Sequence, residues 1–179
     1  MSRPDRKLLQ IYTSIDERVS SVHEQSSPLA WPCMRGCDGC CYRLSDVPLI
    51  TNAEWDMLAQ SIRNVPEHFS RFAAGIHRLA QHEQNAERSV VACPFIAPDD
   101  GASRPGSCLV YEGRPAACRS YGYFAERHDV LGCEDVLTHA VQMNVVWGNQ
   151  TALQRELDAV SSSMLPRQSL VAWWKRDFE

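Results

Sequence analysis

The chain has 179 residues, with 18 Lys or Arg and 22 Asp or Glu, so its formal net charge is −4. This length predicts one domain that can bury an ordinary hydrophobic core. The weak negative charge gives no electrostatic reason to expect nucleic acid or an anionic membrane as a partner. No stretch approaches the roughly 18 apolar residues that span a bilayer. We therefore expect neither nucleic acid nor a membrane among its partners.

The first residues predict a cytoplasmic protein. The charged run from Arg3 to Lys7 is not followed by an apolar segment of signal-peptide length. Cytosolic thiols remain reduced, so we expect free or metal-bound cysteines. Four disulfides in a secreted protein would fit the even cysteine count, but the missing signal argues against them.

Helical patterns fill the first part of the chain. Apolar residues recur at steps of three and four within 5–25, which predicts one amphipathic helix. Thr51 and Glu54 have the spacing of a capping box, with Thr51 as the N-cap of a second helix. Pro66 is expected to begin a third helix.

The middle of the chain changes character after Glu87. Segments 90–96 and 107–111 are short and rich in β-forming residues, and a turn pattern at 98–101 separates them. They could pair as a hairpin with a long loop.

The last third is again helical in pattern. Apolar stripes occur at 136–145 and 153–164, and Ser169 is placed to cap a final short helix. We therefore expect a mainly α fold of the α+β class, with helices around an irregular Cys-rich metal-binding core and a small β-hairpin. The expected parts are an N-terminal helix (1–30), a cysteine-cluster metal-binding domain (31–135), and C-terminal helices packed on the same core (136–179).

Eight cysteines are the main chemical feature of the sequence. Four lie within nine residues and four follow singly: Cys33, Cys37, Cys40 and Cys41, then Cys93, Cys108, Cys118 and Cys133. Thiolates are soft ligands that hold zinc, iron or iron–sulfur clusters in the cytosol. Gly36 and Gly39 would let the backbone wrap closely around an ion. We therefore expect all eight cysteines to be metal ligands.

The cysteines and their neighbours form a longer pattern. Cys-x3-Cys-x2-Cys-Cys is followed by Cys93-Pro94-Phe95, then by Gly-x-Cys-x-x-Tyr-Glu-x-Arg-Pro-x-x-Cys-Arg ending at Arg119, then by Cys133. This pattern resembles the YkgJ-type cysteine-cluster family, described as a zinc- or iron-chelating domain. The resemblance covers about 33–133 and implies metal binding.

The spacing bears on which metal is bound. Iron–sulfur clusters accept three local cysteines plus a remote fourth, and Cys33, Cys37 and Cys40 match that pattern. Zinc sites prefer paired Cys-x2-Cys knuckles, of which the chain has one. An iron–sulfur cluster or iron is therefore slightly favoured, with zinc as the close alternative. The adjacent Cys40 and Cys41 should diverge, so eight thiolates suggest two sites of four, or one cluster plus one mononuclear ion.

Other residues could support the centre. Arg114 and Arg119 flank Cys118, and we expect them to offset thiolate charge and to contact the site. His128 is the one histidine that we consider as a ligand.

These features predict a metal-binding protein with a structural or redox role and a possible protein or redox partner. The alternatives are a zinc-binding adaptor for a protein partner and a metal-dependent modification enzyme.

Overall fold

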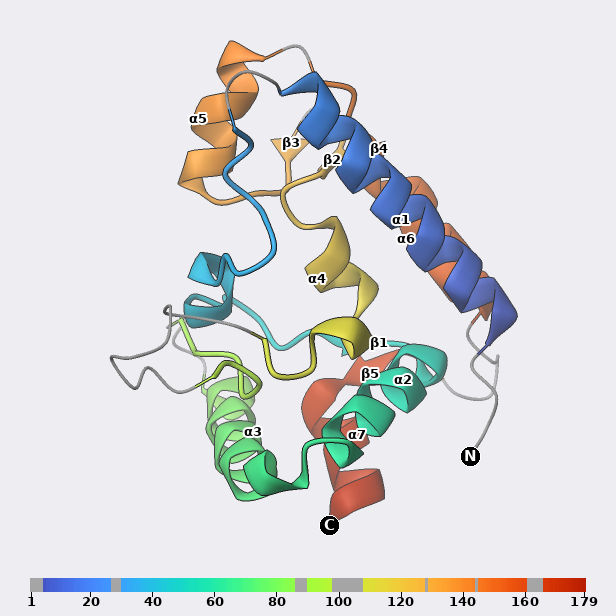
Figure 1. The fold of residues 1–179 in the computed structure, drawn as a ribbon. Coiled ribbons are helices and arrows are strands. Elements are labelled where there is room, and N and C mark those ends of the chain that lie inside the picture. The colour runs from blue at the N-terminus through green and yellow to red at the C-terminus, as the bar shows by residue number, and fades with distance from the viewer. Residues whose placement is uncertain are drawn as a thin grey trace.

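A computed structural model gives the arrangement of most of the chain (Figure 1). The described residues are 5–26, 30–85, 90–97, 108–127, 129–143, 145–160 and 166–179. Within them the fold is mainly helical with a small β component, which confirms the predicted fold class. The helices are α1 (Arg6–Gln25), α2 (Asn52–Arg63), α3 (Phe69–Gln84), α4 (Ala116–Ser120), α5 (Glu134–Gln142), α6 (Gln150–Val160) and α7 (Leu170–Phe178). Short 3-10 helices are η1 (Gly39–Tyr42), η2 (Pro66–His68) and η3 (Tyr111–Gly113).

The helices begin where local sequence signals place them. At the start of α2, the Glu54 amide donates to Thr51 Oγ1 over 3.2 Å and the Thr51 amide donates to Glu54 Oε2 over 2.8 Å, which completes the predicted capping box. Ser169 caps α7 by accepting a hydrogen bond from the amide of Ala172. Two of the helices therefore start at the caps expected from the sequence.

The strands are short. β1 (Leu49–Ile50) pairs antiparallel with β5 (Gln168–Ser169), while β2 (Phe124–Glu126) lies between antiparallel β3 (Asp129–Val130) and parallel β4 (Gly148–Asn149).

The segments 90–96 and 107–111 meet, in their described part, through one antiparallel bridge between Ile96 and Cys108. Pro94 lacks the amide that a longer ladder would require. The regular hairpin is instead β2–β3, and the turn predicted at 98–101 lies outside the described residues.

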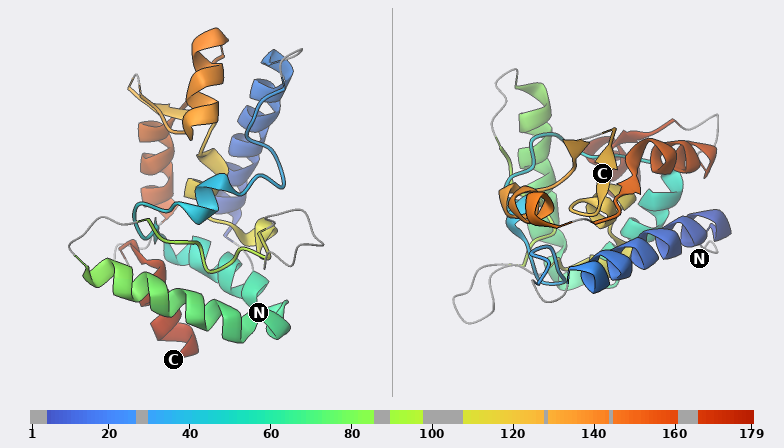
Figure 2. Two further views of the ribbon diagram at one scale, coloured as in Figure 1. Left: turned by 90° about the vertical axis from the view of Figure 1, so that its left-hand side faces the viewer. Right: turned by 90° about the horizontal axis from the view of Figure 1, so that it is seen from above.

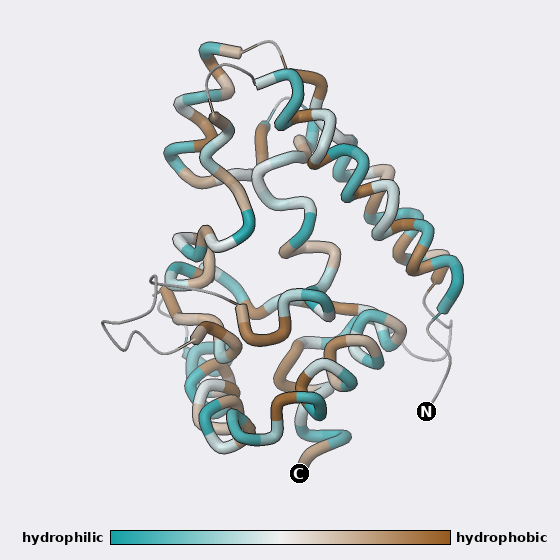
Figure 3. Tube along the Cα trace, viewed as in Figure 1, coloured by the Kyte–Doolittle hydropathy of each residue, from teal (hydrophilic) through white to brown (hydrophobic). Residues whose placement is uncertain are grey.

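Buried apolar side chains form two clusters, which we call the α1–α6 core and the α2–α3–α7 core. The α1–α6 core includes Leu8, Ile15, Trp31, Phe124, Val136 and Leu157. The α2–α3–α7 core includes Trp55, Leu58, Phe72, Leu79, Trp173 and Trp174. In Figure 1 the first core occupies the upper part of the molecule and the second the lower part, and Figure 3 shows apolar residues recurring along the helices of both. The C-terminal helices α6 and α7 thus belong to different clusters.

The apolar stripe expected at 136–145 is only partly buried. Val136 and Val145 are buried, but Leu137 is 43% exposed and Val141 is 89% exposed. The expectation is wrong for these two residues because the described part of the fold covers only one side of α5. No helix within the described ranges is long and apolar enough to cross a membrane.

The segment 32–49 runs between the two cores (Figure 2). Its neighbours Trp31 and Ile50 are buried, whereas no side chain from 32 to 49 is. Cys33, Leu44 and Val47 pack against the cores only as partly buried residues, so apolar burial holds this segment, which carries four of the eight cysteines, less firmly than it holds the helices.

Candidate metal centre

All eight cysteines are free thiols in the described structure. Cys37 and Cys118 are exposed and the other six are partly buried. The first four lie in the segment 32–49, Cys118 lies on α4, and Cys133 is the N-cap of α5. The eight cysteines thus come from five separated stretches of sequence.

Tight turns shape the first cysteine segment. Gly36 has a φ of +94°, which side chains other than glycine rarely adopt. The Cys37 amide donates to the Met34 carbonyl over 3.0 Å, and the Cys41 amide to the Asp38 carbonyl over 2.7 Å at the start of η1. The segment is therefore an irregular loop with one 3-10 turn, as its glycines predicted.

Cys33 lies against the turn that follows α4. Its Sγ is 3.6 Å from the Tyr121 carbonyl oxygen. Gly122 has a φ of +87°, and a Cβ at this position would come within 3.0 Å of Cys33 Sγ. The Tyr123 hydroxyl donates to the Cys33 carbonyl and contacts His23 Nε2 at 3.1 Å. No local sequence pattern indicated that Gly122 and Tyr123 would contact Cys33.

Backbone pairing brings three other cysteines together. The Cys93 amide donates to the Cys41 carbonyl over 2.7 Å, next to a bridge between Leu44 and Val91. Cys108 is joined to the same strand-like segment through its bridge to Ile96.

Cys118 lies on α4, whose first residue is bonded to the start of α2. Pro115 precedes α4 as expected, and the amide of Ala116 donates to Glu54 Oε1 over 3.0 Å. Glu54 is 2% exposed, so this carboxylate links the starts of α2 and α4 inside the protein. Its capping role was predicted, but its bond to α4 carries no sequence signal.

The thiols influence one another electrostatically. Burial raises the pKa of Cys33 to about 11, and the negative charge of Cys37, Cys40 and Cys133 adds to this rise, while its hydrogen-bond interaction with Tyr123 opposes it. Interaction with the Cys41 thiol is the first cause of the raised pKa of Cys40, followed by burial. Neighbouring thiolates thus disfavour one another, which is the situation that a shared cation relieves.

Cys41 and Cys118 are also influenced by neighbouring thiols. The Cys40 thiol lowers the pKa of Cys41, but its contact with Cys93 and burial outweigh this and raise it to about 12. Burial, and then charge on Cys41, Cys108 and Cys40, raises the pKa of Cys118 to about 12. Part of the Cys118 surface is nevertheless exposed to solvent.

The two arginines have different surroundings. Burial raises the pKa of both Cys108 and Cys118, and the positive charge of Arg114 opposes part of that rise, so its charge lies near these thiols. Its Cζ is 3.8 Å from the Tyr111 ring centroid, and its Nε is buried with no hydrogen-bond acceptor among the described residues.

Arg119 is turned to α1 instead. It is 7% exposed and donates to the carbonyls of Glu112 over 2.6 Å and Arg114 over 3.1 Å, with Asp16 at 3.5 Å. The two hydrogen bonds join α4 to η3 and to the residue that follows it, and the contact with Asp16 joins α4 to α1.

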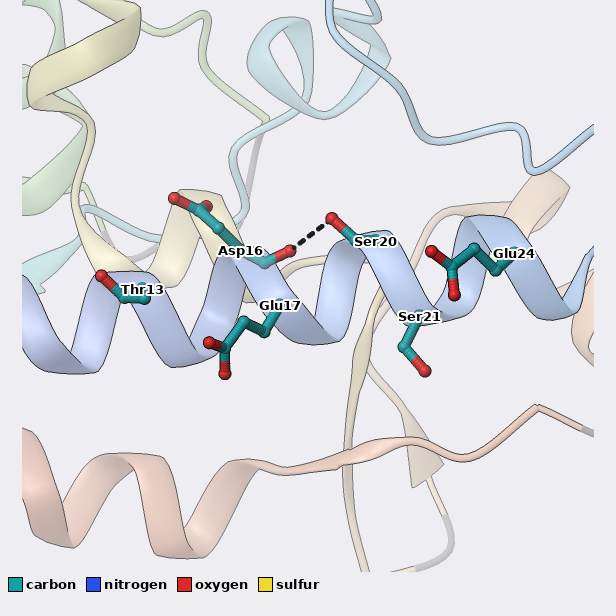
Figure 4. Close-up of a pocket in the computed structure, with 6 residues that line it drawn as sticks. All are labelled: Thr13, Asp16, Glu17, Ser20, Ser21 and Glu24. Carbon is teal, nitrogen blue, oxygen red and sulfur yellow. Dashed lines mark hydrogen bonds between the residues drawn. The ribbon is translucent and has the colours of Figure 1, made fainter.

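The thiols of the described residues do not form a complete metal-coordination site. In the part of the chain that the structure describes, no three His, Cys, Asp or Glu side chains converge closely enough to hold a metal ion. His128 lies outside the described residues. A hollow on α1 is lined by polar side chains from Thr13 to Glu24 (Figure 4) and by none of the cysteines. It therefore has no part in the thiol chemistry.

No family model, no curated protein and no solved structure matches this chain. The resemblance to the YkgJ-type family therefore stays a prediction, as does the division into 1–30, 31–135 and 136–179.

Proposed function

We propose that the chain is a cytoplasmic protein of the YkgJ type that binds metal through its cysteines, with an iron–sulfur cluster or iron favoured over zinc. The role of the centre is structural or redox. One observation carries the proposal: eight free thiols from five stretches of sequence lie near enough for each to influence, or be influenced by, another of them electrostatically.

The donor set fits a soft metal. The cysteines offer sulfur donors. Burial is the main cause of the raised pKa of Cys33 and of Cys118, and the charge of neighbouring thiolates adds to both rises. Sulfur donors select zinc, iron and iron–sulfur clusters over hard cations. The eight cysteines would hold the metal, which would supply either a rigid cross-link or a one-electron redox couple when bound. The ligand shell would have to close as the metal binds, because no three such side chains converge among the described residues.

Residues around the thiols suit a negatively charged centre. Arg114 supplies a permanent positive charge near Cys108 and Cys118, which offsets thiolate charge. Tyr123 fixes the backbone at Cys33 through its hydroxyl. Such surrounding groups orient ligands and tune the metal.

Metal analysis of the full chain purified without oxygen tests the proposal. We expect iron with acid-labile sulfide and a brown protein with broad visible absorption. Stoichiometric zinc in a colourless protein would instead favour the adaptor role, still with cysteine ligation. Protein that contains no metal, and takes up neither iron nor zinc under reducing conditions, would contradict the proposal.

A further inference from the structure

The backbone that follows Cys93 is held firmly on α3. Phe95 is buried, and its ring packs edge-on against Phe72 with the ring centroids 5.1 Å apart. Gly75 lies so close to Pro94 that an added Cβ would be 2.5 Å from the Pro94 Cβ. Because Pro94 is the next residue, Cys93 has a fixed position on the α2–α3–α7 core, against which it packs as a partly buried residue.

Cys41 is bonded to this fixed position through its backbone. The Cys93 amide donates to the Cys41 carbonyl over 2.7 Å. Two further backbone hydrogen bonds of 3.0 Å, between Leu44 and Val91, pair the same two segments in antiparallel orientation. Residues hydrogen-bonded across antiparallel segments have Cα atoms about 5.5 Å apart, which is within the range of about 4.4–6.8 Å that disulfides span. The two backbones are therefore suitably spaced for a disulfide.

The thiols of Cys41 and Cys93 are also in contact. The Cys41 thiol interacts with the thiols of Cys40 and Cys93, of which the first lowers its pKa and the second raises it. Cys40 is the poorer disulfide partner, because the Cα atoms of consecutive residues are only about 3.8 Å apart, below the usual range. Neither Cys41 nor Cys93 is fully buried, so solvent reaches both residues.

We propose that Cys41 and Cys93 form a reversible disulfide that regulates the metal centre of the proposed function, on which this regulatory role rests. The oxidant is a low-molecular-weight disulfide such as oxidised glutathione. One cysteine sulfur attacks it and releases one thiol, and the second cysteine sulfur attacks the mixed disulfide and releases the other. In total, two cysteine thiols lose two electrons and two protons, and one glutathione disulfide is reduced to two thiols. Cytosolic disulfides are commonly transient or redox-sensing, which suits a reversible bond.

The disulfide would have opposite effects on metal and on the fold. It would convert two sulfur donors into a form without thiolate charge, and the thiolate is the form that binds metal. It would also close the chain from Cys41 to Cys93 into a loop that contains α2 and α3, which restricts the unfolded chain. Oxidation should therefore release metal while it stabilises the metal-free protein.

Peptide mapping of the reduced, metal-free full chain after equilibration with oxidised glutathione tests the pairing. We expect one main disulfide, between Cys41 and Cys93, which dithiothreitol reverses, and a higher urea midpoint for the oxidised chain. The bond should be absent in Cys41→Ser and in Cys93→Ser. It should be present in the matched control Cys108→Ser, because Cys108 packs as a partly buried residue against the same core as Cys93. No disulfide, or a main product that joins another pair such as Cys40 and Cys41, would overturn the proposal.

The zinc-loaded wild-type chain separates the regulatory role from the proposed function. Zinc is the probe because it takes no part in redox chemistry itself. Oxidation should release zinc to a chromogenic chelator in proportion to the disulfide formed, and dithiothreitol should restore binding. Disulfide formation with zinc fully retained would contradict the regulatory role, since Cys41 and Cys93 would then not be ligands. A chain that binds neither zinc nor iron but forms the Cys41–Cys93 bond would contradict the proposed function and support the disulfide alone.

Discussion

The hydrophobic cores and the segment 32–49 are stabilised in different ways. The α2–α3–α7 core contains three fully buried tryptophans, and the α1–α6 core contains a fourth, Trp31. The segment between them has no fully buried side chain and is joined to its neighbours by the Leu44–Val91 bridge and by the partly buried Leu44 and Val47. The contrast teaches that apolar burial accounts for the helices, whereas the cysteine segment has few such contacts, so bound metal would stabilise it most under the proposed function.

The largest expected loss of stability comes from a substitution in the α2–α3–α7 core. Trp173 is fully buried and its indole nitrogen donates to the Ile50 carbonyl over 3.0 Å. We expect Trp173→Ala to lower the free energy of unfolding by about 3–5 kcal/mol, measured by urea denaturation. The loss should be the same with and without metal. The exposed control Val141→Ala should change stability by less than about 0.5 kcal/mol. A loss seen only in metal-loaded protein would contradict this assignment.

The two arginines should separate structural support from metal support. Arg119→Gln removes buried donors to two carbonyls and the contact with Asp16, so we expect about 2–3 kcal/mol less stability in the metal-free chain. Arg114→Gln should cost less stability but should release metal faster to a competing chelator, because it removes positive charge near Cys108 and Cys118. Unfolding curves and chelator competition measure the pair. If Arg119→Gln and Arg114→Gln lowered stability equally and released metal equally fast, the two arginines would not have these different roles.

Cys37→Ser addresses the cysteine segment directly. Cys37 is exposed, so its removal should hardly affect the metal-free fold. We expect at least tenfold weaker metal binding, which corresponds to about 1.4 kcal/mol of stabilisation lost in the loaded protein. Calorimetric melting of loaded and metal-free samples measures it, with Met34→Ser as the control. An unchanged melting difference between loaded and metal-free protein would exclude Cys37 as a ligand.

The smallest effect is expected from pH in the metal-free, reduced chain. Folding raises the pKa of Cys33 from 9.0 to about 11, so the unfolded chain loses this proton first as the pH rises. The contribution is complete below pH 9 and declines up to about pH 11. Between pH 8 and 9.5 we expect a loss of at most about 1 kcal/mol from Cys33. Urea midpoints should fall less steeply in Cys33→Ser, and identical slopes would contradict the shift.

Local signals predicted the helices well. Thr51, Glu54 and Ser169 act through neighbours a few residues away, so their caps could be found in the sequence. The exposure of Leu137 and Val141 could not, because periodicity identifies an apolar face without showing what covers it.

The candidate site also has features that the sequence predicted and features that it did not. The cysteines and the arginines were identified from their spacing. The contact of Cys33 with Gly122, and the different directions of Arg114 and Arg119, depend on how distant segments pack, and no local pattern contains that information.

The long separation of the cysteines in sequence has a consequence for assembly of the protein. Cys33 and Cys133 are roughly 100 residues apart, and a cross-link that closes such a loop removes chain entropy worth about 4–5 kcal/mol from the unfolded state. In a nascent chain, however, Cys33, Cys37, Cys40 and Cys41 emerge together and can capture an ion among themselves before their distant counterparts exist. Under the proposed ligation, correct assembly therefore favours an order in which both cores form first and metal arrives last. Early exposure to metal would trap a local complex that must dissociate before Cys133 can enter.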